Sequence, residues 1–342
     1  VVLSSAGEVL AAGSSVAPDP LPYVAAVWDA DTLSGTTGAA VTAWASTNGL
    51  RTATLAAATV LEGGGAIGGA TAPKLQPGAI NGHNAVRFTG ASLSVLGLAV
   101  DQNPLAGVTN FSVAVVFRAD APGKTGPNRQ WWEGMGLIDA EEPGATYDWG
   151  ISLTANGRVA AGLGNTDATV FSKPFDLCDG TPHVAVVSYN ATGGFTAVMV
   201  DGLSVLRSAG AHVTPRNVKR LLLGAVNGEG GKFFSGDLAA FQLFPERVLA
   251  ETEMASLSTG LAAKYGIRFV SRGNTMSPQG TATLGGGDVQ IYSGASLVLP
   301  TSTNAAVTLG AGQTIYGGGA VRGTLALSSG STVDIGLTEA LT

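Results

Sequence analysis

Short strand-like phrases separated by glycine run through the middle of this chain, most clearly between Asn110 and Gly266. Phrases such as FSVAVVFRA, PHVAVVSYN and GDLAAFQLF alternate apolar and polar residues, as strands with one face against a core do. The intervening turns are rich in Gly, Asn and Asp, which tight turns favour. Many short strands joined by such turns predict an all-β protein, an antiparallel β-sandwich of two sheets.

Composition narrows the class of protein. Of 342 residues, 45% are hydrophobic, 12% are charged and 50 are glycines, so small neutral side chains dominate. The net charge of -6 offers no basic surface for nucleic acid, and no apolar run approaches the roughly 20 residues that span a bilayer. The single cysteine, Cys178, cannot form an intrachain disulfide. Stability must therefore come from burial and strand pairing, and the composition suits extracellular β-structure or close self-packing.

The chain reads as three parts. Residues 1–22 end in APDPLP, whose prolines favour an extended N-terminal segment. Residues 23–266 hold the sandwich phrases and close with the one helical pattern, over 246–266. In residues 267–342 aromatic residues become rare, no lysine remains and a loose glycine repeat begins. This last part predicts a β-rich, short β-solenoid-like segment.

The repeat in the last part consists of a glycine, two or three small residues and then an aliphatic strand. Its glycines are Gly294, Gly310 and Gly330, about 16 to 20 residues apart, which is the length of one turn of a narrow β-solenoid. About three stacked turns and two end caps are usually needed for stability. Nothing polar or rich in proline covers the edge at Leu341 and Thr342. We expect the tail to continue in a longer polypeptide or to be completed by another subunit.

The phrases WDADTLSG, INGHNAVRF, FSVAVVFR, PHVAVVSYN and GDLAAFQLF, in this order, resemble the laminin-G-like, concanavalin-A-like jelly-roll domains of bacterial surface proteins. The resemblance covers residues 23–266, and the tail resembles the β-strand repeats of autotransporter-like surface proteins. It implies an extracellular or cell-surface location and a sandwich that binds sugars or proteins at its loop rim, sometimes through calcium. In such domains the strand PHVAVVSYN is core, so His183 is expected to be a hydrogen-bonded residue at a strand start.

The same architecture includes retaining glycoside hydrolases, which place paired carboxylates on a strand of E-x-D-x-x-E type. The nearest phrase here is LIDAEE, residues 137–142. Asp139 and Glu142 match the assisting carboxylate and the acid/base, but Leu137 stands at the nucleophile position and cannot attack an anomeric carbon. The sequence therefore predicts a protein that is not an enzyme.

Calcium is the one candidate cofactor. It takes six to eight oxygen ligands, and the resemblance suggests loop carboxylates and carbonyls as their source. The candidates flank two neighbouring strand phrases and are Asp139, Asp148, Asn165 and Asp167. The alternative is ordinary turn chemistry, in which Asp and Asn are favoured without any metal.

Trp131 and Trp132 follow a polar loop and precede Glu133. In an extended segment adjacent side chains face opposite ways, so one indole would be core and the other exposed. An exposed Trp is a platform for stacking sugars or contacting proteins, and we expect Trp131, Trp132 and Glu142 to bind the ligand. The alternative is that a loop or an interface covers both rings.

These observations predict an extracellular structural or adhesive surface protein that associates with other copies of itself through its terminal β-segments. The alternative is a carbohydrate-binding, lectin-like module whose partners are surface glycans. A glycoside hydrolase of concanavalin-A-like fold ranks third. No nucleic acid and no transmembrane segment are expected.

Overall fold

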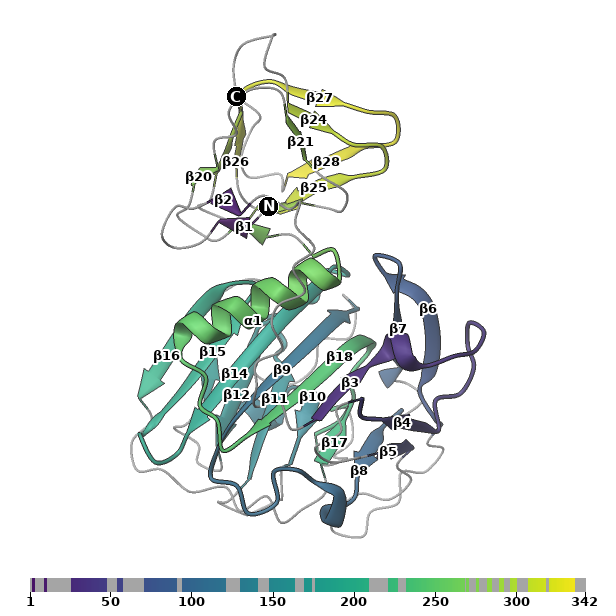
Figure 1. Cartoon of the computed structure of the whole chain (residues 1–342), viewed down its shortest axis with the longest axis vertical. Helices are drawn as coiled ribbons and strands as arrows, with labels where there is room; N and C mark the ends of the chain where they lie inside the picture. Colours follow the sequence, from purple (N-terminus) through teal and green to yellow (C-terminus); the bar gives the residue numbers. More distant parts are fainter. Residues whose placement is uncertain are drawn as a thin grey trace. The chain divides into compact units, whose positions relative to one another are not determined.

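The structure is a computed structural model that describes residues 2–3, 9–10, 26–47, 54–57, 71–90, 94–120, 130–140, 148–163, 169–173, 176–208, 221–226, 232–267, 269–270, 275–276, 282–284, 289–291, 296–299, 307–317 and 320–335. The chain forms two compact units, coloured along the sequence in Figure 1. The sandwich unit holds residues 18–200 and 204–258, and the C-terminal unit holds residues 1–17, 201–203 and 259–342.

Two eight-stranded sheets build the sandwich unit. The first sheet runs in the order β13 (Val170–Phe171), β12 (Val159–Leu163), β11 (Trp149–Leu153), β10 (Met135–Asp139), β17 (Leu221–Leu223), β8 (Leu96–Leu98), β5 (Thr54–Ala57) and β4 (Ala43–Ala45). The second sheet runs in the order β16 (Leu203–Ser208), β15 (Phe195–Val200), β14 (Pro182–Asn190), β9 (Asn110–Ala119), β18 (Gly236–Pro245), β7 (His83–Phe88) and β6 (Lys74–Ile80), and β3 (Ala26–Asp29) also pairs with β18. Short 3₁₀ helices η1 (Ala30–Thr32), η3 (Val100–Gln102) and η5 (Trp131–Glu133) lie between strands.

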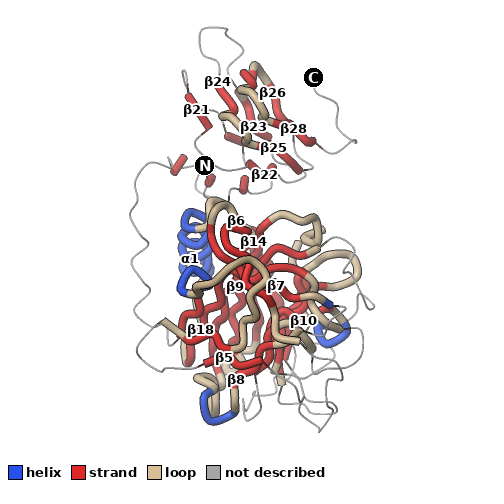
Figure 2. Tube along the Cα trace, turned by 90° about the vertical axis from the view of Figure 1, so that its right-hand side faces the viewer, coloured by secondary structure: helices blue, strands red, loops and turns tan. Residues whose placement is uncertain are grey.

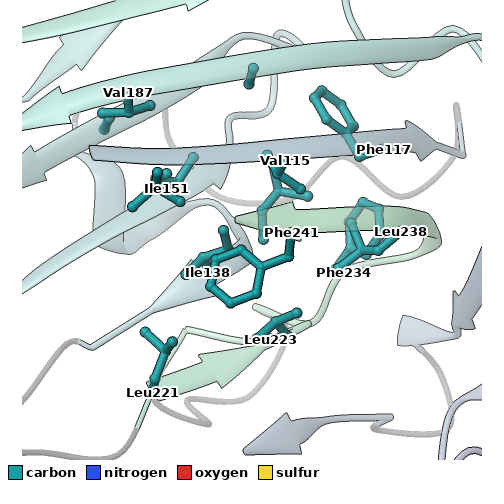
Figure 3. Packing of buried hydrophobic residues seen from close by; sticks show 14 of the residues in the cluster. Val115, Phe117, Ile138, Ile151, Val187, Leu221, Leu223, Phe234, Leu238 and Phe241 are labelled. Atoms are coloured by element: carbon teal, nitrogen blue, oxygen red, sulfur yellow. The ribbon is translucent and has the colours of Figure 1, made fainter. Parts of the chain in front are cut away.

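Pairing in both sheets is antiparallel, as in the ladder between β9 and β14 from Arg118↔Pro182 to Asn110↔Asn190. Alternate residues of each strand enter the space between the sheets, where they form one hydrophobic core. Figure 3 shows Val115 and Phe117 of β9 directed toward this core together with Ile138 of β10. The predicted all-β antiparallel sandwich is therefore confirmed.

The face of the second sheet that points away from the core is buried as well. Ala114 and Val116 of β9 and Val184 and Val186 of β14 have almost no exposed surface although they do not face the first sheet. Helix α1 (Glu251–Lys264) and the segment before it cross this side of the sheet (Figure 1). The helical pattern in the sequence is confirmed, and the helix begins later than the pattern does.

The C-terminal unit contains the N-terminal hairpin and three small parallel sheets. The hairpin pairs β1 (Val2–Leu3) with β2 (Val9–Leu10). The parallel sheets are ordered β19 (Phe269–Val270), β22 (Val289–Ile291), β25 (Thr314–Gly317), β28 (Thr332–Ile335); then β20 (Thr275–Met276), β23 (Ser296–Val298), β26 (Ala320–Arg322); and β21 (Ala282–Leu284), β24 (Val307–Leu309), β27 (Leu325–Leu327).

Each strand from β19 to β25 pairs in parallel with the strand three places later in the chain, and Figure 2 shows most of these strands from the side. Paired residues are 18 apart in Val307↔Leu325 and 26 apart in Val289↔Ile315, a wider range than the glycine spacing predicted. Inside the strands lies a separate small core of Val289, Ile291, Leu297, Leu299, Leu309, Ile315 and Val321. Parallel pairing between successive turns of the chain is thus the organising feature of this unit.

Candidate functional site

The described candidates lie on the outer face of the first sheet, the face directed away from the core. They are Trp131 and Trp132 in η5, Asp139 at the end of β10 and Asp148 directly before β11. Three further candidates, Glu142, Asn165 and Asp167, lie outside the described residues.

A row of five aligned residues, three of them glycine, crosses this outer face. Strand register aligns Gly97, Leu222, Asp139, Gly150 and Gly162, one from each of β8, β17, β10, β11 and β12. Their neighbours along each strand belong to the core, so this row, termed the glycine row, faces the other way. Because three of its five members lack a side chain, another group can approach the backbone closely.

The indole of Trp131 is that group. A Cβ atom at Gly150 or Gly162 would overlap atoms of the Trp131 ring, so the ring lies directly on the backbone of β11 and β12. Trp131 is completely buried, and its Nε1 has no hydrogen-bond partner. Its main chain is held by the side chains of Ser152, which donates to its carbonyl, and Thr169, which accepts from its N–H at 3.3 Å. The sugar-stacking role predicted for this residue therefore has no open ring face in the structure.

Trp132 is partly exposed and contacts Trp131 edge to face, with ring centroids 5.6 Å apart and planes at 87°. The segment is not extended: residues 131–133 form a 3₁₀ turn, capped by reciprocal hydrogen bonds between Gln130 and Glu133. The turn sets the two rings perpendicular instead of on opposite sides of a strand. Of the two tryptophans, Trp132 is the one with surface left for a partner.

Asp139 and Asp148 share the outer face of the hairpin formed by β10 and β11. Asp139 is 1% exposed and pairs with Gly150, and the N–H of Ala140 donates to the carbonyl of Trp149 at 2.9 Å. Since Trp149 is core, its neighbour Asp148 projects to the same side as Gly150 and Asp139. Two of the four predicted calcium ligands are therefore on one face. Among the described residues, no group of three or more His, Cys, Asp or Glu side chains could hold a metal.

Beneath this hairpin, Tyr189 of β14 is fully buried and its hydroxyl donates to the carbonyl of Gly150 at 2.9 Å. Burial raises the pKa of Tyr189 well above its ordinary value, and the negative charge of Asp139 raises it further. The phenol consequently stays protonated and serves as a fixed hydrogen-bond donor to β11.

Leu137, at the position expected for a nucleophile, is buried in the sandwich core. The register of β10 and β11 shifts between Gly136 and Ile138, and Asp139 follows on the outer face. Leu137 and Asp139 are therefore on different sides of the sheet, and Glu142, the predicted acid/base, lies outside the described residues.

Sequence reasoning missed a charged cluster on the second sheet. Asp237 of β18, completely buried, lies between Arg87 of β7 (Nε to Oδ1, 3.0 Å) and Arg118 of β9 (Nη2 to Oδ2, 2.6 Å). Arg87 also binds Asp120, to which Ser235 donates. Burial raises the pKa of Asp237 in spite of the two guanidinium groups. These groups are close only because of strand register, which joins three distant parts of the chain, and they bind one another.

His183 is confirmed as a buried residue at the start of a strand, β14. Its Nε2 lies 3.2 Å from Oδ1 of Asp179, and its ring contacts Phe117 at 5.6 Å between centroids. Within the described residues, no helix is long and apolar enough to cross a membrane.

Comparison with known proteins yields no matching family model and no matching curated protein. Among solved structures, the chain is similar to the binding domain of Paraclostridial Mosquitocidal Protein 1 (12% identity, TM-score 0.48, 70% of this chain and 52% of that chain). It is also similar to domain 4 of AbnA, a GH43 extracellular arabinanase from Geobacillus stearothermophilus, in complex with arabinotriose. The identity is 14% and the TM-score 0.46, over 69% of this chain and 98% of that chain. A third similar structure is the botulinum neurotoxin serotype D binding domain, with 11% identity and a TM-score of 0.46 over 70% of this chain and 52% of that chain. The chain spans about half the length of the two toxin domains.

Proposed function

We propose that this protein is a non-catalytic, extracellular structural or adhesive surface module that joins other copies of itself through its terminal β-segments. The observation that carries the proposal is a strand edge that has no partner strand in the described part of the chain. No described strand pairs with the outer edges of β26, β27 and β28, and Leu327 of β27 is 59% exposed, the one large hydrophobic side chain so exposed in the described part of the chain. Open edges with apolar side chains favour strand addition.

The edge of the second sheet of the sandwich offers a contrast. Edge strand β6 contains Pro77, which cannot donate a hydrogen bond, and Gly78, whose φ of +69° bends the strand. Its register with β7 shifts between Gln76 and Ile80. Such features prevent edge-to-edge pairing. Strands β26, β27 and β28 contain no proline and so carry no comparable protection.

The outer face of the first sheet also supports a role without catalysis. Leu137 is directed into the core. The ring of Trp131 lies on the backbone of β11 and β12 and fills the space through which a substrate would approach the sheet. A retaining hydrolase needs two carboxylates across an accessible sugar site.

Sedimentation velocity over a range of concentrations tests the proposal. We expect reversible association of the wild-type protein, weakened by Leu327→Lys and preserved in Ser329→Lys, an exposed position in the following turn. Circular dichroism of each variant checks that the fold is retained. A protein that remains monomeric up to high concentration would contradict self-association.

A carbohydrate-binding module is the second candidate function, favoured by the partly exposed and rigidly packed ring of Trp132. Binding on a glycan array should be lost in Trp132→Ala and kept in the control Ser256→Ala, at an exposed position on helix α1. Equal binding by both variants would exclude Trp132 as the sugar platform.

Calcium remains a prediction for Asp139 and Asp148. Both are nearly buried on one face, and oxygen donors are what calcium prefers. Calcium chloride should raise the melting temperature of the wild type but not of Asp148→Ala, with Asp101→Ala, an exposed carboxylate in η3, as control. An identical rise in all three proteins would contradict a site at Asp148.

A further inference from the structure

We propose that Asn190 is the acceptor of an N-linked glycan in the folded protein and that Asn110 is not. The proposal goes beyond self-association and rests on the extracellular location proposed above, because this modification is made on exported chains. The sequence contains two acceptor triplets of the form Asn-x-Ser/Thr, residues 110–112 and residues 190–192. The triplet alone does not tell the two sites apart, whereas their hydrogen bonds and burial do.

The triplet at residues 190–192 lies at the surface. Asn190 is the last residue of β14 and is partly exposed, and residues 191–194 form the turn that leads into β15. Thr192, whose hydroxyl completes the triplet, is exposed. An acceptor triplet in a surface turn can enter the active site of a glycosyltransferase without any change in the sheet.

The amide nitrogen of Asn190 has no hydrogen-bond acceptor in the described part of the chain. The side-chain oxygen, Oδ1, does have a partner, since it accepts a hydrogen bond from the N–H of Gly193 at 2.6 Å. A Cβ atom at Gly193 would overlap Nδ2 of Asn190. Glycine at this position therefore leaves space next to the nitrogen that the sugar must reach.

Transfer of the glycan changes only this nitrogen. Nδ2 attacks the anomeric carbon of a sugar that is activated as a lipid-linked diphosphate, so a C–N bond forms and the bond from that carbon to the diphosphate oxygen breaks. The bonding electron pair leaves with the lipid diphosphate, and one proton of Nδ2 passes to a base of the transferase. The product keeps Oδ1 and one N–H, so the hydrogen bond from Gly193 is retained.

The triplet at residues 110–112 is closed. Nδ2 of Asn110 donates to Oγ1 of Thr192 at 2.8 Å, and Oδ1 of Asn110 accepts from the N–H of Thr192 at 3.1 Å. Phe111 is part of the sandwich core, and Ser112 is 0% exposed and donates to the carbonyl of Arg247. A transferase could reach this triplet only by separating β9 from β14 and β18, the strands on either side of it.

The two asparagines also compete for space. They are directly opposite in the ladder between β9 and β14, and their side chains share the face of the sheet away from the core. Opposite residues of an antiparallel pair have Cβ atoms about 5 Å apart, so a glycan on one crowds the other. A glycan on Asn110 would in addition displace Thr192, to which its nitrogen donates. We expect one glycan per folded chain.

Secretion of the full chain from cultured animal cells tests the proposal. The folded protein is purified by size exclusion, and its intact mass is measured before and after treatment with peptide-N-glycosidase. We expect the enzyme to remove the mass of one glycan. Release in water enriched in oxygen-18 converts the acceptor Asn to a labelled Asp, and peptide mapping should place this label at residue 190. A protein that carries no glycan, or one labelled at residue 110, would overturn the proposal.

Substitutions within the two triplets provide the matched comparison. Asn190→Gln and Thr192→Val should abolish the mass shift, whereas Thr192→Ser, which keeps the hydroxyl, should retain it. Asn110→Gln is the control and should carry the same single glycan as the wild type. Circular dichroism checks that each variant is folded. A glycan that persists in folded Asn190→Gln would show that Asn110 is open and would contradict the assignment.

The glycan and self-association are tested independently. Sedimentation velocity reports association of the protein with and without the glycan, and the mass shift reports the modification. An unmodified protein that associates overturns only the glycan at Asn190. A glycosylated protein that remains monomeric, before and after removal of the glycan, overturns only self-association.

Discussion

At the scale of single residues, the packing of Trp131 on the outer face of the first sheet depends on two glycines, which have no side chain. Gly150 and Gly162 leave the backbone of β11 and β12 bare, and the ring of Trp131 fills the space that larger residues would need. Neither glycine stands in a turn, so turn chemistry does not account for them. They are small because an aromatic ring lies on them, which no pattern along the chain reveals.

Trp131→Ala should lower the free energy of unfolding by about 3 to 5 kcal/mol, the usual cost of removing a large buried aromatic side chain. The cavity left over the glycines should accept free indole, which would raise the melting temperature of the variant but not of the wild type. Trp132→Ala, at a partly exposed position, should cost clearly less. Equal losses in urea denaturation of the two variants would contradict the burial of Trp131.

Asp179 offers a second test at this scale. Burial alone raises the pKa of its carboxyl group, but hydrogen bonds from His183 and Thr181 and the charge of His183 outweigh burial and lower the pKa from 3.8 to about 2. A lowered pKa in the folded state stabilises the protein above the unfolded pKa, and this stabilisation is lost as pH falls from about 4 to about 2. Partial exposure of the carboxylate limits it to about 1 to 2 kcal/mol.

Asp179→Asn should therefore make the free energy of unfolding depend less on pH between pH 2 and pH 4. Outside this range the substitution should change the pH dependence less. Urea denaturation at several pH values measures it. Asp101→Asn, at an exposed position, is the control and should keep the wild-type slope. An unchanged slope in Asp179→Asn would show that the carboxylate gains nothing from His183.

At the scale of elements, side chains on the second sheet determine the residue at which helix α1 begins. The apolar pattern predicted a helix over residues 246–266, and the helix spans Glu251–Lys264. Ser112 of β9 accepts a hydrogen bond from the N–H of Leu249 and donates to the carbonyl of Arg247, while Ser188 of β14 donates to the carbonyl of Leu249. Backbone groups of this segment thus bind the sheet instead of the first helical turn.

Ser112→Ala and Ser188→Ala should each cost about 1 to 3 kcal/mol, because each leaves buried backbone groups of the docking segment with fewer partners. The two hydroxyls are 2.7 Å apart and share Leu249, so their effects should not add in the double variant. Thermal unfolding of the wild type, the two single variants and the double variant measures this non-additivity, with Ser256→Ala on the exposed side of α1 as control. Strictly additive losses would argue against a shared contact.

At the scale of the whole molecule, the chain consists of two compact units with separate hydrophobic cores. The sandwich core is large, and the core of the C-terminal unit is a narrow column of aliphatic side chains. Unfolding of the two should therefore be separable, since a single transition is expected only for one cooperative unit.

All five tryptophans, Trp28, Trp44, Trp131, Trp132 and Trp149, belong to the sandwich unit. Tryptophan fluorescence should consequently follow the sandwich alone, whereas far-ultraviolet circular dichroism follows both units. In urea, we expect the dichroism to begin its change at lower concentration than the fluorescence. Leu309→Ala, which removes a buried side chain from the C-terminal core, should shift only that first change; coincident transitions in both proteins would indicate one cooperative unit.

The sequence by itself determined the kind of structure: alternating strands and glycine-rich turns specify antiparallel sheets, and a lone cysteine leaves burial to stabilise them. The resemblance of its strand phrases to known sandwich domains also implied that His183 stands at the start of a buried strand, as it does in β14. Tertiary structure alone decided which faces stay open. The ring of Trp131 covers Gly150 and Gly162, and Asp237 binds two arginines, while Leu327 is exposed. Each of these depends on strand register between distant parts of the chain, and register is a property of paired strands rather than of any one segment.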